Sequence, residues 1–500
     1  MKTTNFTNLD VQQLKMREIS LKDAKAQLKI LTNGVPFLSI VAPATINNGV
    51  VKLDNYDSYV KLWEEKLKEE IRVVKFTPAS GAASRMFKDL VAYVEGEEPL
   101  NDLVAGFFES LPNYPFYEAL LPYIKDIDDS TEEGKKQILT CFLEKGGLNY
   151  KNKAKGLLLF HRYGDEVRTA FEEHIEEGCL YAMTADKKVN LHFTVSLHSL
   201  ALFEELEQNV KEKYEKKYDC EIEIKYSVQE KSTDTIALDI EAKAPFRKKD
   251  GTLLLRPGGH GALIHNLNKL RSDYIFIKNI DNVVPDDEKP LVVYYKKALA
   301  GILVEKQKMV YDYLKAVTDR NAEKPDKEKL LKFLEEELMI KVTDKVRRYN
   351  TKKTLRFFIE KLNRPIRVCG MVRNAGDPGG GPVWVGNNRY EQLQIAEISQ
   401  LNMEDIYVKD AIENSSHFNP VDIVCSTKDY KGEFMDLHHF VDPETAFISL
   451  KSQDGKPLKA YEHPGLWNGA MAKWTTIFVE VPYETFSPTK TVFDLLKHNK

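Results

Sequence analysis

The sequence predicts an α/β protein in which a mixed, mainly parallel sheet is flanked by helices and carries helical insertions. Two observations predict this class. Short β-branched and other apolar runs alternate along the chain with longer amphipathic segments, which is typical of parallel strands covered by helices. Hydrophobic residues make up 42% of the 500 residues, enough for a large core and for about two to four domains.

The strand-like runs place the core of the sheet in three parts of the chain, 71–97, 186–287 and 363–500. Residues 1–70 are expected to form an N-terminal helical segment. Residues 98–185 and 288–362 are expected to be helical insertions, because apolar residues recur there at helical spacing among many charges, for example over 166–175. The expected strands are 71–76, 189–195, 221–228, 274–277, 366–369, 383–385, 421–425 and 475–481.

Composition and charge exclude several classes of protein. With 72 basic and 76 acidic residues the net charge is −4, which lacks the basic bias of a nucleic-acid-binding protein. No segment approaches the ~18–20 apolar residues of a membrane-spanning helix, and the polar start lacks the pattern of a signal peptide. Five scattered cysteines argue against a zinc knuckle or a disulfide framework. We therefore expect a cytoplasmic protein that binds neither nucleic acid nor membranes.

The first segment suited to chemistry is Ser80-Gly-Ala-Ala-Ser-Arg-Met86, between an expected strand and an expected helix. Small side chains let phosphate oxygens approach backbone N–H groups, and the start of a helix favours anions. Arg85 can bind a phosphate through two parallel hydrogen bonds. No Gly-Lys-Ser/Thr closes the segment, so it is not a Walker A loop. The alternative is a tight strand–helix turn with a surface arginine.

A second segment, Arg256-Pro-Gly-Gly-His-Gly261, combines three glycines with a proline. Glycines expose the backbone, so such a loop can lie flat against a base or a ribose where a side chain would clash. His260 either donates a hydrogen bond to an anion or holds the loop by bonding a carbonyl.

A third segment is the expected strand 274–277 with Asn279, Asp281 and Asn282 after it. In open α/β sheets, ligands bind beyond the carboxyl ends of strands. Asp281 would there be placed to hold Mg²⁺, which prefers carboxylate, phosphate and water oxygens. The alternative is a turn in which Asn and Asp form local hydrogen bonds.

Together with the tail, these segments resemble the UDP-sugar pyrophosphorylases, which make UDP-glucose and UDP-N-acetylglucosamine. The tail resembles the UDP-glucose pyrophosphorylase pattern most closely, with Phe486, Pro488, Lys490 and Asp494 at matching spacing. The other matches are the 80–86 loop, the 257–261 loop, which resembles Pro-Pro-Gly-His-Gly, and the strand end at 274–282. The whole chain also resembles an uncharacterised bacterial family known only as a domain of unknown function.

The resemblance implies a glycosyltransferase-A-like, Rossmann-like fold of the nucleotide-diphospho-sugar transferase superfamily. It implies transfer of a uridylyl group from UTP, or of another NTP's nucleotidyl group, to a sugar 1-phosphate, with Mg²⁺ as cofactor and pyrophosphate as product. By matching position, Arg85 and Lys490 would be catalytic and Asp281 would bind the metal. The implied substrate-binding residues are Ser80 and Gly81 at the triphosphate, Gln229, Gly259, His260 and Gly261 at the base, and Asn279, Asp281 and Asn282 at the ribose, sugar or metal.

Departures from the family pattern leave other functions open. Ala79 and Ser80 stand where the family usually has a second glycine, and Phe87 stands where many members have glycine. A bulky residue at that place can tilt the triphosphate or exclude it. A non-catalytic nucleotide-sugar binding protein and a glycosyltransferase on the same fold are therefore the alternatives, and the sequence leaves the oligomeric state open.

Two further segments have no assigned role. His161, Arg162 and Arg168 lie close in sequence and form either an anion site or a charged helix start with pairs along one face. The glycine-rich segment 374–382 is either a lid or sugar-side loop, or a long irregular turn.

Overall fold

The computed structural model describes residues 6–376 and 380–497 and divides the chain into two compact units. Unit 1 comprises Met1–Lys66, Gln229–Ile275 and Ala298–Val481. Unit 2 comprises Leu67–Val228, Phe276–Lys297 and Pro482–Lys500. Each unit is therefore assembled from segments that lie far apart in the sequence.

The strands of unit 2 follow the order β12-β4-β7-β8. β4 pairs with β7, and β7 with β8, in parallel. β12 is buried along its whole length, as expected of a strand with both faces covered. A separate antiparallel hairpin joins β5 to β6. The bounds are β4 Val73–Pro78, β5 Leu159–Tyr163, β6 Glu166–Thr169, β7 Lys188–Thr194, β8 Glu221–Ser227 and β12 Tyr274–Lys278.

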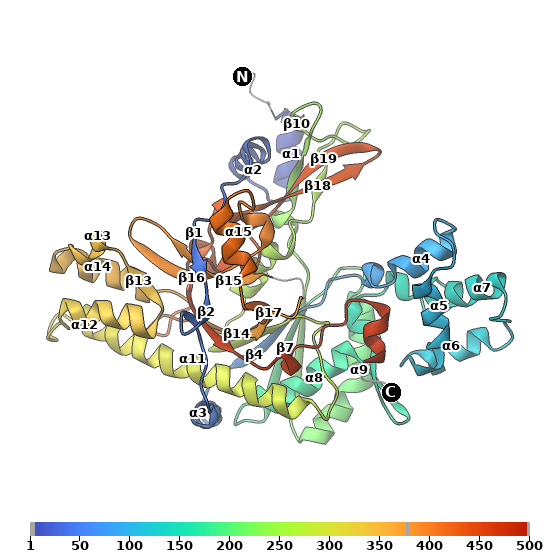
Figure 1. Cartoon of the computed structure of the whole chain (residues 1–500), viewed down its shortest axis with the longest axis horizontal. Helices are drawn as coiled ribbons and strands as arrows, with labels where there is room; N and C mark the ends of the chain where they lie inside the picture. The colour runs from blue at the N-terminus through green and yellow to red at the C-terminus, as the bar shows by residue number, and fades with distance from the viewer. Residues whose placement is uncertain (1–5, 377–379, 498–500) are drawn as a thin grey trace. The chain divides into compact units, whose positions relative to one another are not determined.

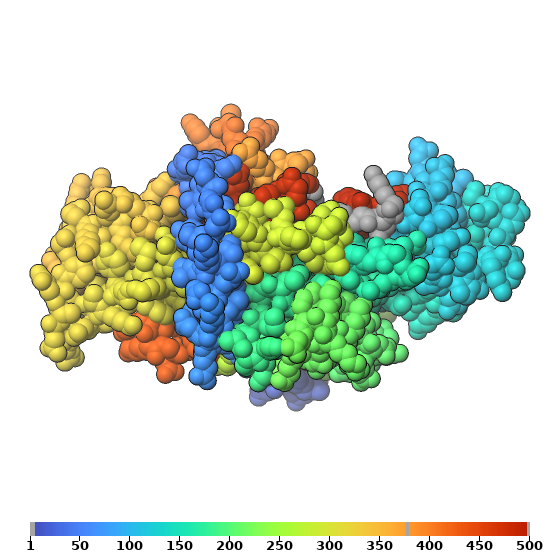
Figure 2. Space-filling model, turned by 90° about the horizontal axis from the view of Figure 1, so that it is seen from below, coloured from blue at the N-terminus to red at the C-terminus, as the bar shows by residue number. Residues whose placement is uncertain are grey.

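The helices of unit 2 fall into two groups. α8 is almost completely buried, and Thr169 starts it by exchanging hydrogen bonds with Glu172 in a capping box. α4 to α7 gather around an aromatic core, and Figures 1 and 2 show them in light blue and cyan as one block. The bounds are α4 Lys88–Glu95, α5 Asp102–Glu109, α6 Tyr117–Ile124, α7 Glu132–Leu143, α8 Ala170–Tyr181 and α9 Leu200–Tyr218.

The strands of unit 1 fall into three groups of paired neighbours. β2-β3-β20-β14 are parallel neighbours, and β17 pairs antiparallel with β14. Two further sheets, ordered β1-β15-β16-β13 and β10-β9-β19-β18, have antiparallel pairs, and β11 also pairs with β9. The bounds are β1 Ile40–Pro43, β2 Thr45–Ile46, β3 Gly49–Val51, β9 Thr235–Asp239, β10 Ala244–Pro245, β11 Leu255–Arg256, β13 Ile340–Val342, β14 Ile366–Arg373, β15 Gly381–Gly386, β16 Tyr390–Ala396, β17 His417–Ser426, β18 Phe447–Gln453, β19 Lys456–Glu462 and β20 Thr475–Glu480.

The helices of unit 1 cover these sheets. α1 and α2 share an apolar cluster with β9, including Leu28 and Ile236. The long α11 contributes its first turns, to Lys297, to unit 2 and the rest to unit 1. The bounds are α1 Asn8–Met16, α2 Leu21–Asn33, α3 Asp57–Lys66, α10 Ile264–Asn268, α11 Lys289–Thr318, α12 Lys327–Lys332, α13 Asp344–Arg347, α14 Thr351–Leu362 and α15 Ile406–Glu413.

The predicted α/β class is confirmed: parallel strands flanked by helices form the core of each unit. Each expected strand is present within a few residues, but 383–385 lies in β15 of a separate antiparallel sheet. The helical pattern expected over 166–175 is wrong in its first part, because Glu166–Thr169 pairs with β5 and the helix starts at Ala170. None of the described helices is long and apolar enough to span a bilayer.

Candidate functional site

The loop after β4 presents backbone donors to solvent. Its first residue, Ala79, is fixed because its N–H donates to the Thr194 carbonyl at 2.8 Å. Ser80, Gly81 and Ala82 are then exposed, and within the described chain their N–H groups donate to no acceptor. Adjacent, unpaired N–H groups at an exposed strand end are suited to an anion such as a phosphate.

Phe87, the bulky residue near this loop, points into the core. Its side chain is fully buried, and its ring meets Phe142 edge-on with 5.2 Å between centroids. Arg85, two residues earlier, is exposed and forms no ion pair in the described chain. The exposed face of the loop therefore carries the Arg85 guanidinium and leaves the bulk of Phe87 out of the way of a bound anion.

Asn279, Asp281 and Asn282 follow the carboxyl end of β12, as the sequence predicts. Asn282 is buried, and its side-chain oxygen accepts a hydrogen bond from the Ser487 N–H at 3.0 Å. Asn279 is partly exposed, and Asp281 keeps 20% of its side chain exposed. Asn282 thus holds the C-terminal tail, while Asn279 and Asp281 are accessible to a ligand.

Lys155 joins the loop, the strand end and the tail. Its backbone N–H donates to the Gly81 carbonyl at 3.2 Å. Its Nζ donates to Asp281 Oδ2 at 2.7 Å and to the Thr489 carbonyl at 2.9 Å. Sequence reasoning missed Lys155, because nothing local separates it from the other lysines of 151–155. One lysine residue therefore joins three of the motifs that predicted a site, one through its backbone and two through its ammonium.

The tail that carries Lys490 is fixed through its backbone. The Thr489 N–H donates to the Asp281 carbonyl at 2.9 Å, and the Lys490 N–H donates to the Asp494 carboxylate at 2.9 Å. The Lys490 side chain is exposed, with Nζ 5.7 Å from the centre of the Phe486 ring, and it forms no ion pair in the described chain. Its charge is available to a ligand next to Asp281.

A buried ion network links the strands that lead into these loops. Lys75 on β4 and Lys278 on β12 donate to the two carboxylate oxygens of Glu177 on α8, at 2.9 and 2.6 Å. Burial would raise the pKa of Glu177, but Lys278 and Lys75 hold that pKa well below its usual range. Burial lowers the pKa of Lys75 to about 7. α8 therefore holds β4 and β12 through one carboxylate.

His174, also on α8, connects the ends of the same two strands. Burial and the nearby Lys75 lower its pKa well below the usual 6.5, so the imidazole is neutral. Its Nε2 lies 3.2 Å from the Ile280 carbonyl, which only accepts, so Nε2 carries the proton. Nδ1 is then an acceptor, 3.5 Å from the Thr77 hydroxyl. Thr77 lies two residues before Ala79, the first residue of the loop, and Ile280 directly precedes Asp281, so His174 fixes the geometry between the loop and Asp281.

In unit 1, the glycines of the second segment allow close packing. A Cβ at Gly261 would lie 2.1 Å from the Pro464 carbonyl oxygen, and Gly259 has a left-handed φ of +76°. His260 accepts a hydrogen bond from the Leu466 N–H through Nδ1 at 3.2 Å. Burial lowers the pKa of His260 to about 4. The imidazole thus supports the loop, although by bonding an N–H and not the carbonyl expected from the sequence.

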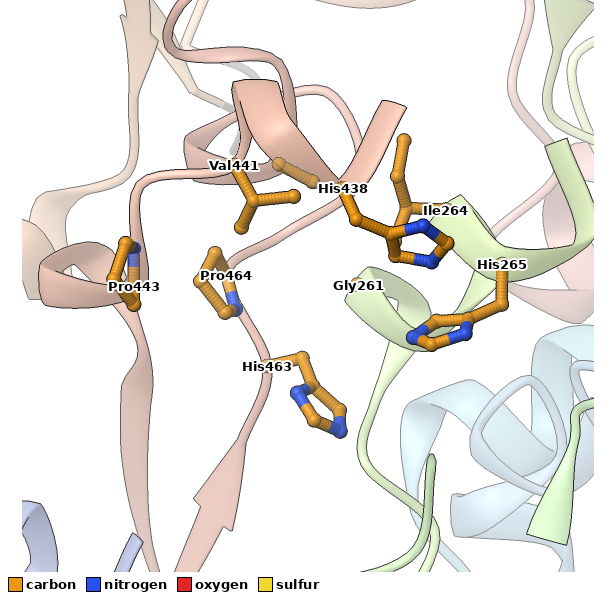
Figure 3. Close-up of a pocket in the computed structure, with 9 residues that line it drawn as sticks. Gly261, Ile264, His265, His438, Val441, Pro443, His463 and Pro464 are labelled. Atoms are coloured by element: carbon orange, nitrogen blue, oxygen red, sulfur yellow. The ribbon is translucent and has the colours of Figure 1, made fainter. Parts of the chain in front are cut away.

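A pocket of about 260 Å³ lies beside this loop, and Figure 3 shows its lining. The rings of His265 and His438 approach each other with 4.3 Å between centroids. His463 enters from the segment that follows β19, and its Nε2 lies 2.9 Å from the Thr233 carbonyl. The remaining lining residues are Gly261, Ile264, Val441, Pro443, Pro464 and Ala470.

The predicted site residues are shared between the two units. Unit 2 contains Ser80, Gly81, Arg85, Asn279, Asp281, Asn282 and Lys490, and unit 1 contains Gln229, Gly259, His260 and Gly261. Within unit 2, Lys155 brings the Gly81 loop and Asp281 together with the residue that precedes Lys490. Gln229 is partly exposed in the loop after β8. No group of three or more His, Cys, Asp or Glu in the described chain has the arrangement of a metal site.

The cations of the 159–168 segment already have protein partners. Arg168 pairs with Glu166 at 2.6 Å and with Asp286 at 2.8 Å, and Arg162 donates to the Tyr114 carbonyl at 2.8 Å. These side chains stabilise the β5–β6 hairpin and its surroundings. For the glycine-rich segment 374–382, residues 377–379 lie outside the described residues, so both of its interpretations stand.

Comparisons with known proteins give a family and a group of similar folds. The profile of a family described as a domain of unknown function (DUF4301) matches residues 7–500. No curated protein matches the chain in sequence. Among solved structures, a mutant UDP-glucose pyrophosphorylase from Leishmania major in complex with UDP-glucose is 13% identical, with a TM-score of 0.47, over 99% of this chain and 80% of its own.

Two trypanosome structures are similar to the same degree. A UDP-glucose phosphorylase from Trypanosoma brucei is 12% identical, with a TM-score of 0.46, over 98% of this chain and 78% of its own. The uridine diphosphate N-acetylglucosamine pyrophosphorylase of Trypanosoma brucei, in complex with an inhibitor, is 11% identical, with a TM-score of 0.47, over 98% of this chain and 82% of its own.

Removing the charge of Glu177 should destabilise the protein strongly. Glu177→Gln leaves two buried lysines without a carboxylate, and we expect the free energy of unfolding to fall by about 3–5 kcal/mol in urea denaturation. Glu212→Gln on α9 is the matched control, because Glu212 is exposed and its ion pair with Lys216 lies at the surface, and it should behave as wild type. Wild-type stability of Glu177→Gln would show that the network does not hold the strands.

His260 should make unit 1 sensitive to acid. Its folded pKa of about 4 lies below the usual 6.5, so the unfolded chain takes up a proton first as the pH falls. Stability is therefore lost from about pH 6.5 down to about pH 4. We expect the acid-induced decrease in the free energy of unfolding to be smaller by up to about 3 kcal/mol in His260→Asn, which keeps an acceptor for the Leu466 N–H.

The measurement is urea unfolding at pH 7 and pH 4.5, followed through tryptophan fluorescence, to which Trp467 contributes with its ring packed on His260 at 4.5 Å between centroids. His439→Asn is the control, since that side chain is 79% exposed. An equal acid-induced loss in wild type and His260→Asn would contradict the assignment.

Proposed function

The chain belongs to the DUF4301 family, and on that premise we propose that it is a nucleotidyltransferase that makes a UDP-sugar and pyrophosphate from UTP and a sugar 1-phosphate. One observation carries the proposal: in unit 2, Lys155 bonds the Gly81 carbonyl, the Asp281 carboxylate and the Thr489 carbonyl. Three motifs that resemble UDP-sugar pyrophosphorylases thus meet at one residue, through its backbone N–H at Gly81 and its ammonium at Asp281 and Thr489, and this places a cation beside them for a polyanionic substrate.

The proposed reaction needs positioning and charge neutralisation and no covalent enzyme intermediate. An oxygen of the sugar 1-phosphate forms a bond to the α-phosphorus of UTP. The bond from that phosphorus to the oxygen bridging the α- and β-phosphates breaks, and pyrophosphate leaves with that oxygen. The catalytic task is to hold two anions in line and to balance the negative charge that develops.

The residues of unit 2 supply donors for these anions. The N–H groups of 80–82 and the exposed Arg85 are proposed to hold the triphosphate. Lys155 and Lys490 are proposed to neutralise the α-phosphate and the departing pyrophosphate, with Lys155 fixed by its bond to Asp281. Asn279 is proposed to contact the ribose or the sugar. Asn282 supports the site through its bond to the tail.

A divalent cation such as Mg²⁺ fits Asp281. One carboxylate oxygen is bonded to Lys155, and the other accepts no hydrogen bond from the described chain. Mg²⁺ sites in nucleotide enzymes often use one or two carboxylates and complete their shell with phosphate oxygens and water. When bound, the ion would withdraw charge from the phosphates. Asp281 would hold it through the carboxylate oxygen that Lys155 does not bond.

For the base we propose Gln229 and the loop formed by Gly259, His260 and Gly261. The support is their resemblance to the base-side motifs of UDP-sugar pyrophosphorylases, and Gly259 and His260 are the partly exposed residues of this loop. Because burial lowers the pKa of His260 to about 4, its imidazole is neutral near pH 7, so it is proposed to shape the loop and not to bind phosphate.

The activity is tested by incubating the full chain with UTP, Mg²⁺ and a panel of sugar 1-phosphates while pyrophosphate release is measured. The proposal expects pyrophosphate together with a UDP-sugar. Release of UDP from a UDP-sugar would instead identify a glycosyltransferase. Thermal stabilisation by UDP-sugars without turnover would identify a non-catalytic binding protein. No pyrophosphate with any NTP and any sugar 1-phosphate would refute the proposal.

The two lysines should be required for turnover. We expect Lys155→Met and Lys490→Ala each to lower kcat/KM by at least about 100-fold, because each removes a charge that balances the phosphates. Lys490→Ala should keep the wild-type thermal midpoint, since its ammonium is exposed. Lys451→Met, an exposed lysine on β18, is the control and should keep full activity. Wild-type rates in either site variant would remove that lysine from the mechanism.

A further inference from the structure

A second pocket, built from unit 1 alone, has a volume of about 350 Å³. It lies against the face of β16 that carries the alternate residues Tyr390, Gln392 and Gln394. Its other walls come from 36–39, from 385–387, from 442–445 and from 472–473. A volume within the ~300–1,000 Å³ range of small-molecule sites makes this pocket a candidate binding site.

The pocket lies near the amino ends of β14 and β20. The side chain of Gln392 accepts from Arg364, at 3.3 Å, and donates to the Ala472 carbonyl, at 2.6 Å. Arg364 and Ala472 precede β14 and β20, respectively. None of the residues that line the pocket belongs to the motifs of the proposed reaction, so the pocket is not part of that machinery.

Gln394 is the feature that indicates a ligand. The residue is only 7% exposed, and within the described chain its side-chain amide forms no hydrogen bond. Its amide atoms are not completely buried, so they reach the space of the pocket, where a ligand can bond them. The neighbouring Gln392 is fully bonded to the protein, whereas Gln394 offers both a donor and an acceptor to the pocket.

The other polar groups of the pocket define the charge of the ligand. Asp442 and Glu444 contribute two carboxylates and Lys473 one ammonium, which is turned to the Val441 carbonyl at 2.9 Å. The side-chain oxygen of Asn387 accepts from two backbone N–H groups, which leaves its amide N–H groups as donors. A lining with excess negative charge disfavours phosphates and carboxylates.

We propose that this pocket binds an unphosphorylated sugar. Each hydroxyl of a sugar both donates and accepts, which matches carboxylate acceptors beside the amides of Gln394 and Asn387. The C–H face of the ring would lie on the apolar side of the pocket, where Phe37 and Val385 line it. The site is separate from the proposed transferase site and does not depend on that activity.

The test measures saturation-transfer NMR of glucose and of N-acetylglucosamine with the full chain. We expect transfer from the wild-type protein, and at least about a 10-fold weaker affinity for Gln394→Leu, because the leucine cannot bond a hydroxyl. Gln208→Leu, an exposed position on α9, is the matched control and should bind as wild type. Since the amide of Gln394 has no protein partner, Gln394→Leu should keep the thermal midpoint.

Phe37→Ala provides a second variant if Gln394→Leu fails to fold, because Phe37 is 56% exposed at the pocket. It should also weaken binding of both sugars. Glucose 1-phosphate should not bind in this pocket, so Gln394→Leu should leave its transfer signal unchanged. Absence of transfer to either sugar, or equal transfer in wild type and Gln394→Leu, would overturn the proposal. Gln394→Leu should release pyrophosphate at the wild-type rate, so a loss of sugar binding in this variant is distinguishable from a loss of transferase activity.

Discussion

The buried contact of Glu177 with Lys75 and Lys278 is the constraint on which unit 2 depends. One carboxylate on α8 is bonded by a lysine from β4 and a lysine from β12, with all three side chains at most 1% exposed. Since each strand presents its charge at one position, we infer that the contact fixes how α8 is placed along both strands. Apolar side chains of similar volume would fill the same space without specifying that placement.

The geometry of the loops follows from this contact. β4 and β12 end a few residues beyond Lys75 and at Lys278, and the neutral His174 spans the two ends. The backbone that leads into the 80–82 loop and into Asp281 is therefore fixed. Lys155 then connects both segments to the tail. The exposed hydrogen-bond donors are therefore held in fixed positions, and a site needs this if it is to bind a polyanion without reorganising.

The strands, the loop after β4 and the position of Asp281 at a strand end were predictable because their signals are local. A β-branched run followed by small or Asn/Asp-rich residues indicates a strand end wherever it lies. Lys155 and Gln394 were not predictable, because the role of each depends on residues of distant segments that folding brings next to it. The glutamates of α8 resemble a solvent-exposed face in the sequence, and only the partners supplied by other segments explain their burial. The inward direction of Phe87 likewise depends on the aromatic core that receives it.

The account is tested most directly by a crystal structure of the full chain with UTP and Mg²⁺. It predicts triphosphate oxygens within about 3 Å of the N–H groups of 80–82 and of Lys155 Nζ, with the cation on Asp281. A triphosphate bound away from the 80–82 loop, with Lys155 still bonded only to Asp281 and Thr489, would contradict it.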